Sequence, residues 1–132
     1  AFCGVANDEL FLIRAECNVR LGQIEMGMED LNTLLLNRYR KNASGSSSYI
    51  LQMAKDETEA LNIILKERRK ELICRSVRWS DLRRLNRDQR FQITLSRDIN
   101  GSVYTLPPND PKYTFLIPAY EILRSGIEQN PR

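Results

Sequence analysis

The segment from Glu67 to Arg84, ERRKELICRSVRWSDLRR, constrains the fold of this 132-residue chain more than any other. At helical spacing, one stripe through it combines leucines with two arginines and the only tryptophan: Leu61, Leu65, Arg68, Leu72, Arg75, Trp79 and Leu82. An arginine in an apolar stripe costs free energy unless carboxylate or carbonyl oxygens accept hydrogen bonds from its guanidinium. The pattern therefore predicts that Arg68 and Arg75 point inward and tie neighbouring segments together, and it does not indicate a catalytic centre.

Length and composition suit one globular domain over residues 1–132, because 42% of the residues are hydrophobic. The 20 basic and 17 acidic residues give a net charge of +3, too even to require nucleic acid or anionic lipid. Histidine is absent, which removes the commonest general base and metal ligand. We therefore predict no catalytic residues, no metal site and no cofactor, and we do not expect an enzyme.

The three cysteines are widely spaced and odd in number, so they suggest neither a metal site nor a disulfide framework. Cys17 and Cys74 lie in helical patterns, which predicts buried free thiols, and Cys3 lies near the start. No apolar run approaches the ~18 residues that span a bilayer, and no signal peptide is recognisable. Because the chain begins Ala-Phe-Cys-Gly without methionine, we expect a processed, trimmed or fragmentary protein.

Residues 1–40 predict a helical hairpin. Its first helix is expected from Asp8 to Arg20, capped by Asn7 or Asp8 and ended by Gly22, and its second from Ile24 to Arg40. Small residues, Ala15 and Gly27, stand where the two helices approach. The pattern resembles a tetratricopeptide-type hairpin, and a generic helical hairpin is the alternative.

Residues 41–53 begin with KNASGSSS and predict a flexible polar linker. The Arg-rich helical segment follows over residues 54–90, with a break or bend near Ser76 and residues 79–85 as a continuation or a separate short helix. Residues 91–132 predict a β-hairpin turning at Asn100-Gly101, and then a short helix from Pro118 to about Ser125. The fold class is therefore mainly α with one small C-terminal β-hairpin.

The cations of the Arg-rich segment are interleaved with Glu67, Glu71, Asp81 and Asp88, which favours structural ion pairs over nucleic-acid binding. Trp79 suits core packing, with stacking on a sugar as the alternative. Four tyrosines are expected in loops or at edges, where they could touch a ligand: Tyr49, Tyr104, Tyr113 and Tyr120. No spacing singles one out, so the ligand-binding residues stay unknown. Two pairs of acids suit solvated or salt-bridged helix surfaces better than catalysis: Glu57 with Glu59, and Glu67 with Glu71.

Four motifs, in order, span nearly the whole chain. They are DELFLIRAECNVRLG followed by MEDLNTL, ERRKEL followed by RWSDLRR, the Asn-Gly hairpin followed by YTLPPNDP, and FLIP followed by EI and QNP. This order resembles the C-terminal region of the SusD/RagB family of outer-membrane nutrient-binding lipoproteins. The chain departs from that family at Arg75-Ser76, where Glu-Gly is common, and in length, since family members run to several hundred residues.

The resemblance implies a binding protein on the outer face of the outer membrane. It would capture an oligosaccharide or another nutrient and deliver it to a SusC-like TonB-dependent transporter. The lipid anchor, the sole expected membrane attachment, would lie upstream of this chain, and no nucleic acid is implied. A tetratricopeptide-like adaptor that docks protein partners is the alternative function.

Overall fold

The computed structural model describes residue 4 and residues 6–132, so the prediction for Cys3 falls outside the described residues. Helices dominate and one two-stranded antiparallel sheet lies near the C-terminus, which confirms the predicted fold class. The chain divides into two compact units, Ala1–Arg78 (unit 1) and Trp79–Arg132 (unit 2). That residues 1–132 form a single domain stays a prediction.

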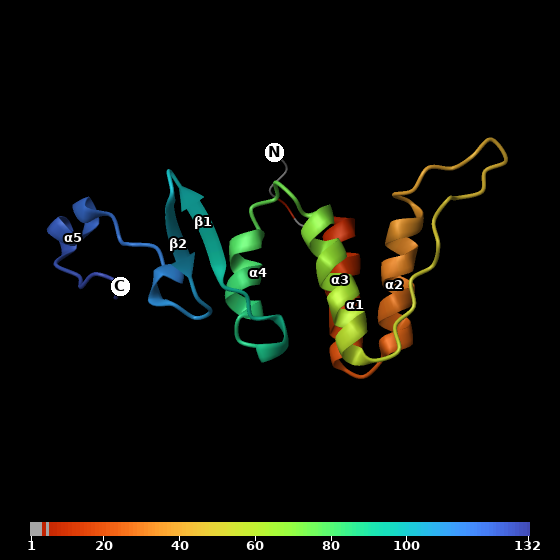
Figure 1. The fold of residues 1–132 in the computed structure, drawn as a ribbon, viewed down its shortest axis with the longest axis horizontal. Helices are drawn as coiled ribbons and strands as arrows, with labels where there is room; N and C mark the ends of the chain where they lie inside the picture. The colour runs from red at the N-terminus through yellow and green to blue at the C-terminus, as the bar shows by residue number, and fades with distance from the viewer. Residues whose placement is uncertain (1–3, 5) are drawn as a thin grey trace. The chain divides into compact units, whose positions relative to one another are not determined.

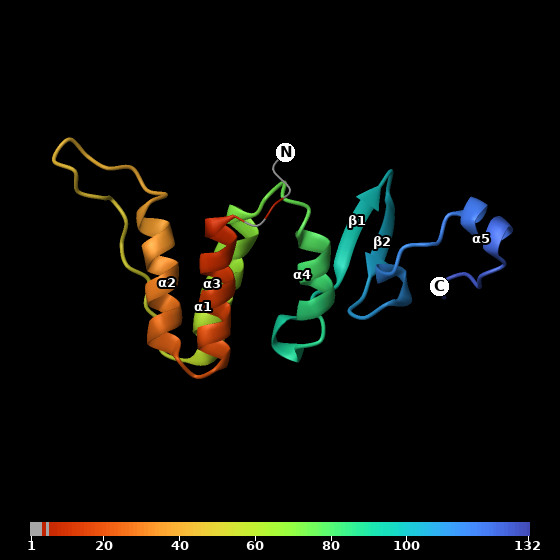
Figure 2. The same cartoon turned by 180° about the vertical axis from the view of Figure 1, so that it is seen from behind.

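Unit 1 is a bundle of three helices, α1 (Asn7–Arg20), α2 (Ile24–Leu36) and α3 (Glu57–Glu71). Figures 1 and 2 show α1 and α2 running antiparallel, with α3 packed beside them. Its core is formed by aliphatic and methionine side chains: Leu12, Ala15, Val19, Met28, Leu31, Leu34, Leu35, Ala60, Leu61, Ile64 and Leu72. The predicted hairpin is therefore present, although α2 ends at Leu36 rather than Arg40.

The turn and the contact between α1 and α2 depend on glycines at two positions. Gly22 has φ +81°, the left-handed conformation that ends a helix without a side-chain penalty. At Gly27 a Cβ atom would overlap the side chain of Val19 and lie 2.7 Å from the carbonyl oxygen of Ala15. The predicted close approach of the helices at Ala15 and Gly27 is thus confirmed.

The helix starts differ from expectation in one case. The N-cap of α1 is Ala6, with no side-chain hydrogen bond, so the predicted cap by Asn7 or Asp8 is wrong. In α3, by contrast, Asp56 Oδ1 accepts from the backbone N–H of Glu59 at 2.8 Å, while Glu59 accepts from Lys55 N at 2.9 Å. These reciprocal bonds give α3 a well-defined start.

The two arginines of the predicted stripe both bind segments distant in sequence. Arg68 is 7% exposed and its guanidinium lies 3.4 Å from the carboxylate of Glu9. Arg75 is half-buried and donates from Nη2 to the carbonyl oxygen of Gly4 at 2.8 Å. Arg68 therefore points inward as predicted, while Arg75 connects segments from a partly exposed position.

The stripe is not one continuous helix. The α3 helix ends at Glu71, and α4 (Arg78–Leu85) begins after a loop in which Cys74 and Ser76 have φ values of +64° and +61°. The break expected near Ser76 is confirmed, and residues 79–85 belong to a separate helix. Cys17 and Cys74 are free but exposed, so the prediction that these thiols are buried is wrong.

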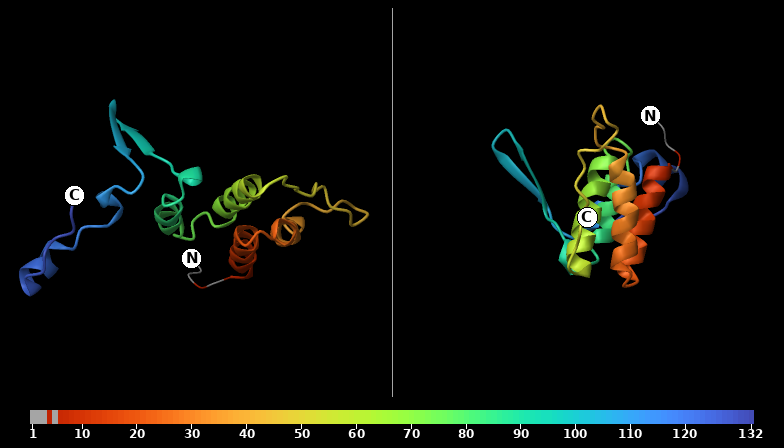
Figure 3. Two further views of the ribbon diagram at one scale, coloured as in Figure 1. Left: turned by 90° about the horizontal axis from the view of Figure 1, so that it is seen from below. Right: turned by 90° about the vertical axis from the view of Figure 1, so that its right-hand side faces the viewer.

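Unit 2 contains α4, the strands β1 (Leu95–Ile99) and β2 (Ser102–Leu106), and α5 (Ala119–Ser125). Figure 3 shows β1 and β2 as a two-stranded ribbon, in which Leu95 pairs with Leu106 and Ile99 with Ser102. Asn100 and Gly101 have φ values of +53° and +80°, as a type I′ turn requires. Four of the five residues in each strand are exposed, so the turn and the backbone hydrogen bonds hold the ribbon together.

The linker between α2 and α3 is anchored near its end, although the sequence predicted a flexible segment. Asn32 Oδ1 accepts from the hydroxyl of Tyr49 at 2.6 Å and from the backbone N–H of Gln52 at 2.8 Å. Asn32 Nδ2 donates to the carbonyl oxygen of Gln52 at 3.0 Å. One side chain of α2 therefore holds the last residues of the linker in place before α3.

The Tyr49 hydroxyl makes the stability of unit 1 sensitive to alkaline pH. Burial raises the pKa of Tyr49 above its ordinary value of 10.0. Because the pKa in the folded state exceeds that of the unfolded chain, the stabilisation is present below pH 10.0 and is lost as the pH rises through the folded-state pKa. We expect the stability difference between the wild type and Tyr49→Phe to shrink between about pH 9 and pH 11, measured by urea denaturation.

Tyr104→Phe is the matched control, since the Tyr104 side chain is 61% exposed on β2. Lysines also titrate in this pH range, and both variants share them, so only the differences from wild type are compared. A stability difference for Tyr49→Phe that stays constant across the range would contradict the assignment.

Candidate functional site

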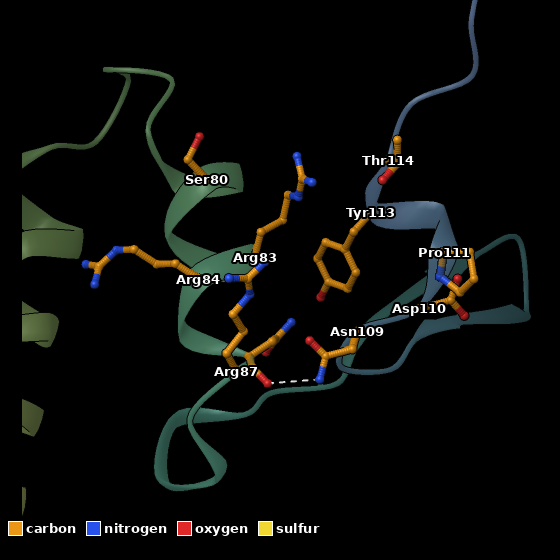
Figure 4. A pocket seen from close by; sticks show the side chains of 10 residues that line it. Ser80, Arg83, Arg84, Arg87, Asn109, Asp110, Pro111, Tyr113 and Thr114 are labelled. Atoms are coloured by element: carbon orange, nitrogen blue, oxygen red, sulfur yellow. Dashed lines mark hydrogen bonds between the residues drawn. The ribbon is translucent and has the colours of Figure 1, made fainter. Parts of the chain in front are cut away.

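A polar hollow lies within unit 2, between α4 and the segment that follows β2. It has a volume of about 460 Å³. Figure 4 shows its lining, which comes from α4, the residues just after it, and residues 109–114: Ser80, Arg83, Arg84, Asn86, Arg87, Asn109, Asp110, Pro111, Tyr113 and Thr114. We call this hollow the α4 pocket.

Asn86 positions the floor of the α4 pocket. Its side chain is 1% exposed, and its backbone carbonyl oxygen accepts from Gln92 Nε2 at 2.9 Å and from Asn109 Nδ2 at 3.0 Å, the bond dashed in Figure 4. Its Oδ1 accepts from the backbone N–H of Ile93 at 3.2 Å. One buried residue thus joins the end of α4 to the loop after β2, 23 residues further along the chain.

The opposite wall is built by a short turn. Asn109 has φ +61°, and Asp110 Oδ1 accepts from the backbone N–H of Lys112 at 2.8 Å. Together with Pro111, which begins a 3-10 helix over Pro111–Tyr113, these residues direct the Tyr113 ring toward α4 (Figure 4). Tyr113 is only 4% exposed, yet its hydroxyl has no hydrogen-bond partner among the described residues.

The lining carries an excess of positive charge, three arginines against the single carboxylate of Asp110. Arg84 forms an ion pair with Asp81, whose Oδ1 lies 3.0 Å from Arg84 Nε. For Arg83 and Arg87, no ion pair is found within the part of the chain that the structure describes. The predicted pairing of the arginines with nearby acids therefore holds for only part of this cluster.

An aromatic cluster adjoins the α4 pocket, and Tyr113 belongs to both. Trp79 Nε1 donates to the carbonyl oxygen of Tyr113 at 3.0 Å, and its ring centroid lies 5.0 Å from that of Tyr113. The Trp79 ring also stacks on Phe115 at 5.3 Å with an interplanar angle of 17°. Since Trp79 is half-buried between other rings, packing explains its position, and Phe115, 69% exposed, is the ring that presents itself to solvent.

The tyrosines and paired acids that the sequence suggested as candidate site residues do not gather at one site. Of the four tyrosines, Tyr113 alone lines the α4 pocket, Tyr49 bonds to Asn32 in unit 1, and Tyr104 and Tyr120 are exposed elsewhere in unit 2. The paired acids act as structural partners, as expected: Glu59 caps α3, Glu67 contacts Lys70, and Glu71 binds Arg38 at 2.7 Å. Their positions do not bring two carboxylates into the pocket.

The C-terminal segment closes on itself around α5. Gln129 Oε1 accepts from Ile117 N at 2.8 Å, and its Nε2 donates to the Ile117 carbonyl at 3.0 Å. Asn130 Nδ2 donates to the carbonyl oxygen of Phe115 at 2.6 Å. These bonds join the backbone of the FLIP motif to side chains of the QNP motif, and they fix the backbone that carries the exposed Phe115 ring.

A second, more apolar groove lies in unit 1, along α2 and the residues leading to α3. Its volume is about 480 Å³, and Leu51 and Met53 in its wall are 64% and 85% exposed. Its lining is Ile24, Glu25, Met28, Glu29, Asn32, Thr33, Leu36, Leu51, Gln52, Met53 and Ala54.

Among the described residues no cluster of metal-ligating side chains is found. No described helix is both long and apolar enough to cross a bilayer.

Unit 1 thus holds a helical hairpin packed with a third helix, and unit 2 holds a basic pocket with an aromatic cluster. A family model described as the SusD family matches residues 9–131, nearly the whole chain, and the protein belongs to that family. No curated protein and no solved structure was found to match the chain significantly.

Proposed function

We propose that this protein takes part in binding a nutrient, a glycan in the first instance, at the outer-membrane surface and in delivering it to a SusC-like TonB-dependent transporter. Membership of the SusD family over residues 9–131 is the observation that carries this proposal. The same membership supports a location on the cell surface and a role in binding rather than catalysis.

The aromatic cluster of unit 2 gives the proposal a physical basis. An exposed aromatic ring held flat against a second ring offers a preorganised apolar face, and sugar rings present C–H groups that can pack on such a face. Phe115 meets this description, since Trp79 supports one side of it and the Asn130 bond fixes its backbone. Little side-chain freedom is then lost when a ligand packs on it.

Titration calorimetry of the 132-residue chain with a panel of neutral and acidic oligosaccharides tests the proposal. We expect saturable binding of at least one of them, and Phe115→Ala should weaken it about tenfold, as expected for losing about 1.4 kcal/mol. Tyr120→Ala is the matched control, because Tyr120 is 62% exposed and lies outside the cluster. If no oligosaccharide binds, and no transporter co-purifies from outer membranes, the proposal fails.

The second candidate function is a tetratricopeptide-like adaptor, which the groove along α2 favours. Since α3 packs on both α1 and α2, one face of the hairpin is covered by the chain itself, while the groove along α2 stays open to solvent. Saturable binding of a peptide that is lost in Met53→Glu, with silent glycan titrations, would favour the adaptor over nutrient binding.

A further inference from the structure

We propose that the α4 pocket binds the oxyanion of an acidic sugar, a carboxylate or a sulfate ester. This inference rests on the proposed function and names the class of glycan within it. The two arginines that carry it, Arg83 and Arg87, belong neither to the buried core nor to the aromatic cluster.

The charge of the lining favours an anion. Arg83 lies in α4 and Arg87 lies two residues beyond its end, and neither has an ion pair in the described part of the chain. Their guanidinium groups present planar pairs of N–H donors that match the two oxygens of a carboxylate or sulfate. The one carboxylate of the lining, Asp110, already accepts from the backbone of Lys112, and the lining keeps a positive excess.

Two buried polar atoms at the same place also lack partners. The Tyr113 hydroxyl and Asn86 Nδ2 make no hydrogen bond, although both residues are more than nine-tenths buried and line the pocket. In Figure 4 the hydroxyl of Tyr113 points into the space between Arg87 and Asn109. Buried donors are seldom left unpaired in folded proteins, and an oxyanion supplies the acceptors that both atoms need.

The size of the pocket fits one sugar residue. Its volume of about 460 Å³ lies within the range of about 300–1,000 Å³ usual for small-molecule sites. Asn109 and Asp110 add amide and carboxylate groups near the arginines, and these can bond to sugar hydroxyls. A neutral sugar carries no negative charge, so it would leave the positive charge of the arginines uncompensated.

Fluorescence of Trp79 reports on the site directly, since it is the only tryptophan and its indole N–H binds the backbone of Tyr113. The 132-residue chain is titrated with glucuronate, with glucose, which lacks the carboxylate, and with inorganic sulfate. We expect a saturable change with glucuronate, none with glucose, and weaker binding of sulfate. Affinity for glucuronate should fall as salt is added.

Two variants locate the binding. Arg87→Gln and Tyr113→Phe should each weaken glucuronate binding at least tenfold, while Arg97→Gln, an exposed arginine of β1 outside the pocket, should leave it unchanged. Circular dichroism confirms that each variant is folded. Unchanged affinity in both pocket variants, or sulfate binding as tightly as glucuronate, would overturn the acidic-sugar assignment.

The outcomes separate this inference from the proposed function. If neutral oligosaccharides bind in a Phe115-dependent way while glucuronate gives no signal, the pocket assignment is wrong and nutrient binding stands. If no sugar of either charge binds, both are wrong.

Discussion

Replacing Gly27 with alanine is expected to destabilise unit 1 by about 3 kcal/mol, the upper end of the usual cost of overpacking a core. The new Cβ atom would overlap Val19 and lie 2.7 Å from the carbonyl oxygen of Ala15, and backbone cannot move aside as a flexible side chain can. Alanine also favours a helix over glycine by about 1 kcal/mol, so the two effects have opposite signs. A fall in the melting temperature of about 10 °C or more would show that the close contact dominates.

Thr33→Ala is the matched control, because it introduces alanine at an exposed position of the same helix. It should change the melting temperature little. A higher melting temperature for Gly27→Ala would mean that α1 and α2 lie further apart at Gly27 than in the structure.

Replacing Arg68 with alanine is expected to lower the free energy of unfolding by about 3 kcal/mol, because it removes a buried side chain and leaves Glu9 without its partner. Arg68→Met keeps most of the buried volume and should cost less, since apolar replacements of buried charges are often tolerated. Urea denaturation of both variants measures the difference.

Arg69→Ala provides the control, as Arg69 is the exposed neighbour of Arg68 on α3. It should lie within about 0.5 kcal/mol of wild type. Equal effects of Arg68→Ala and Arg69→Ala would show that the link between α3 and α1 contributes nothing to stability.

Features encoded by a few adjacent residues were predicted well from the sequence. The turns at Gly22 and at Asn100-Gly101 follow from residues that adopt positive φ easily, and all three residues have positive φ in the structure. The close contact at Gly27 followed from the same reasoning about small residues. These signals are local, so neighbouring segments do not override them.

Features that depend on tertiary contacts were predicted less well. Residues 37–40 contain no glycine or proline, yet α2 ends at Leu36, and Arg38 binds Glu71 of α3 and approaches Asp8 of α1. The break near Ser76 was expected, but the helical spacing continues through it from Leu72 to Trp79, so the pattern did not decide whether residues 79–85 continue the helix or form a separate one. Periodicity alone does not register such an interruption.

The sequence pointed to some residues of the α4 pocket but did not predict that they lie together. The arginines of the RWSDLRR motif and Tyr113 were each identified as noteworthy, but their proximity depends on Asn86 binding Asn109, across 23 residues of chain. Phe115 belongs to the FLIP motif, but nothing in its spacing marks its side chain as exposed, and the bond to its backbone carbonyl comes from Asn130, 15 residues further along the chain. Sequence spacing carries no direct information on either contact.

The β1–β2 ribbon has little interior to define which residues face each other. With eight of its ten side chains in solvent, four on each strand, sliding one strand past the other would sacrifice almost no buried surface. The choice of cross-strand partners is therefore made by two residues, Asn100 and Gly101, whose backbone conformation admits one tight reversal. In this ribbon, the chemistry of a single bend decides which residues of the two strands stand opposite each other.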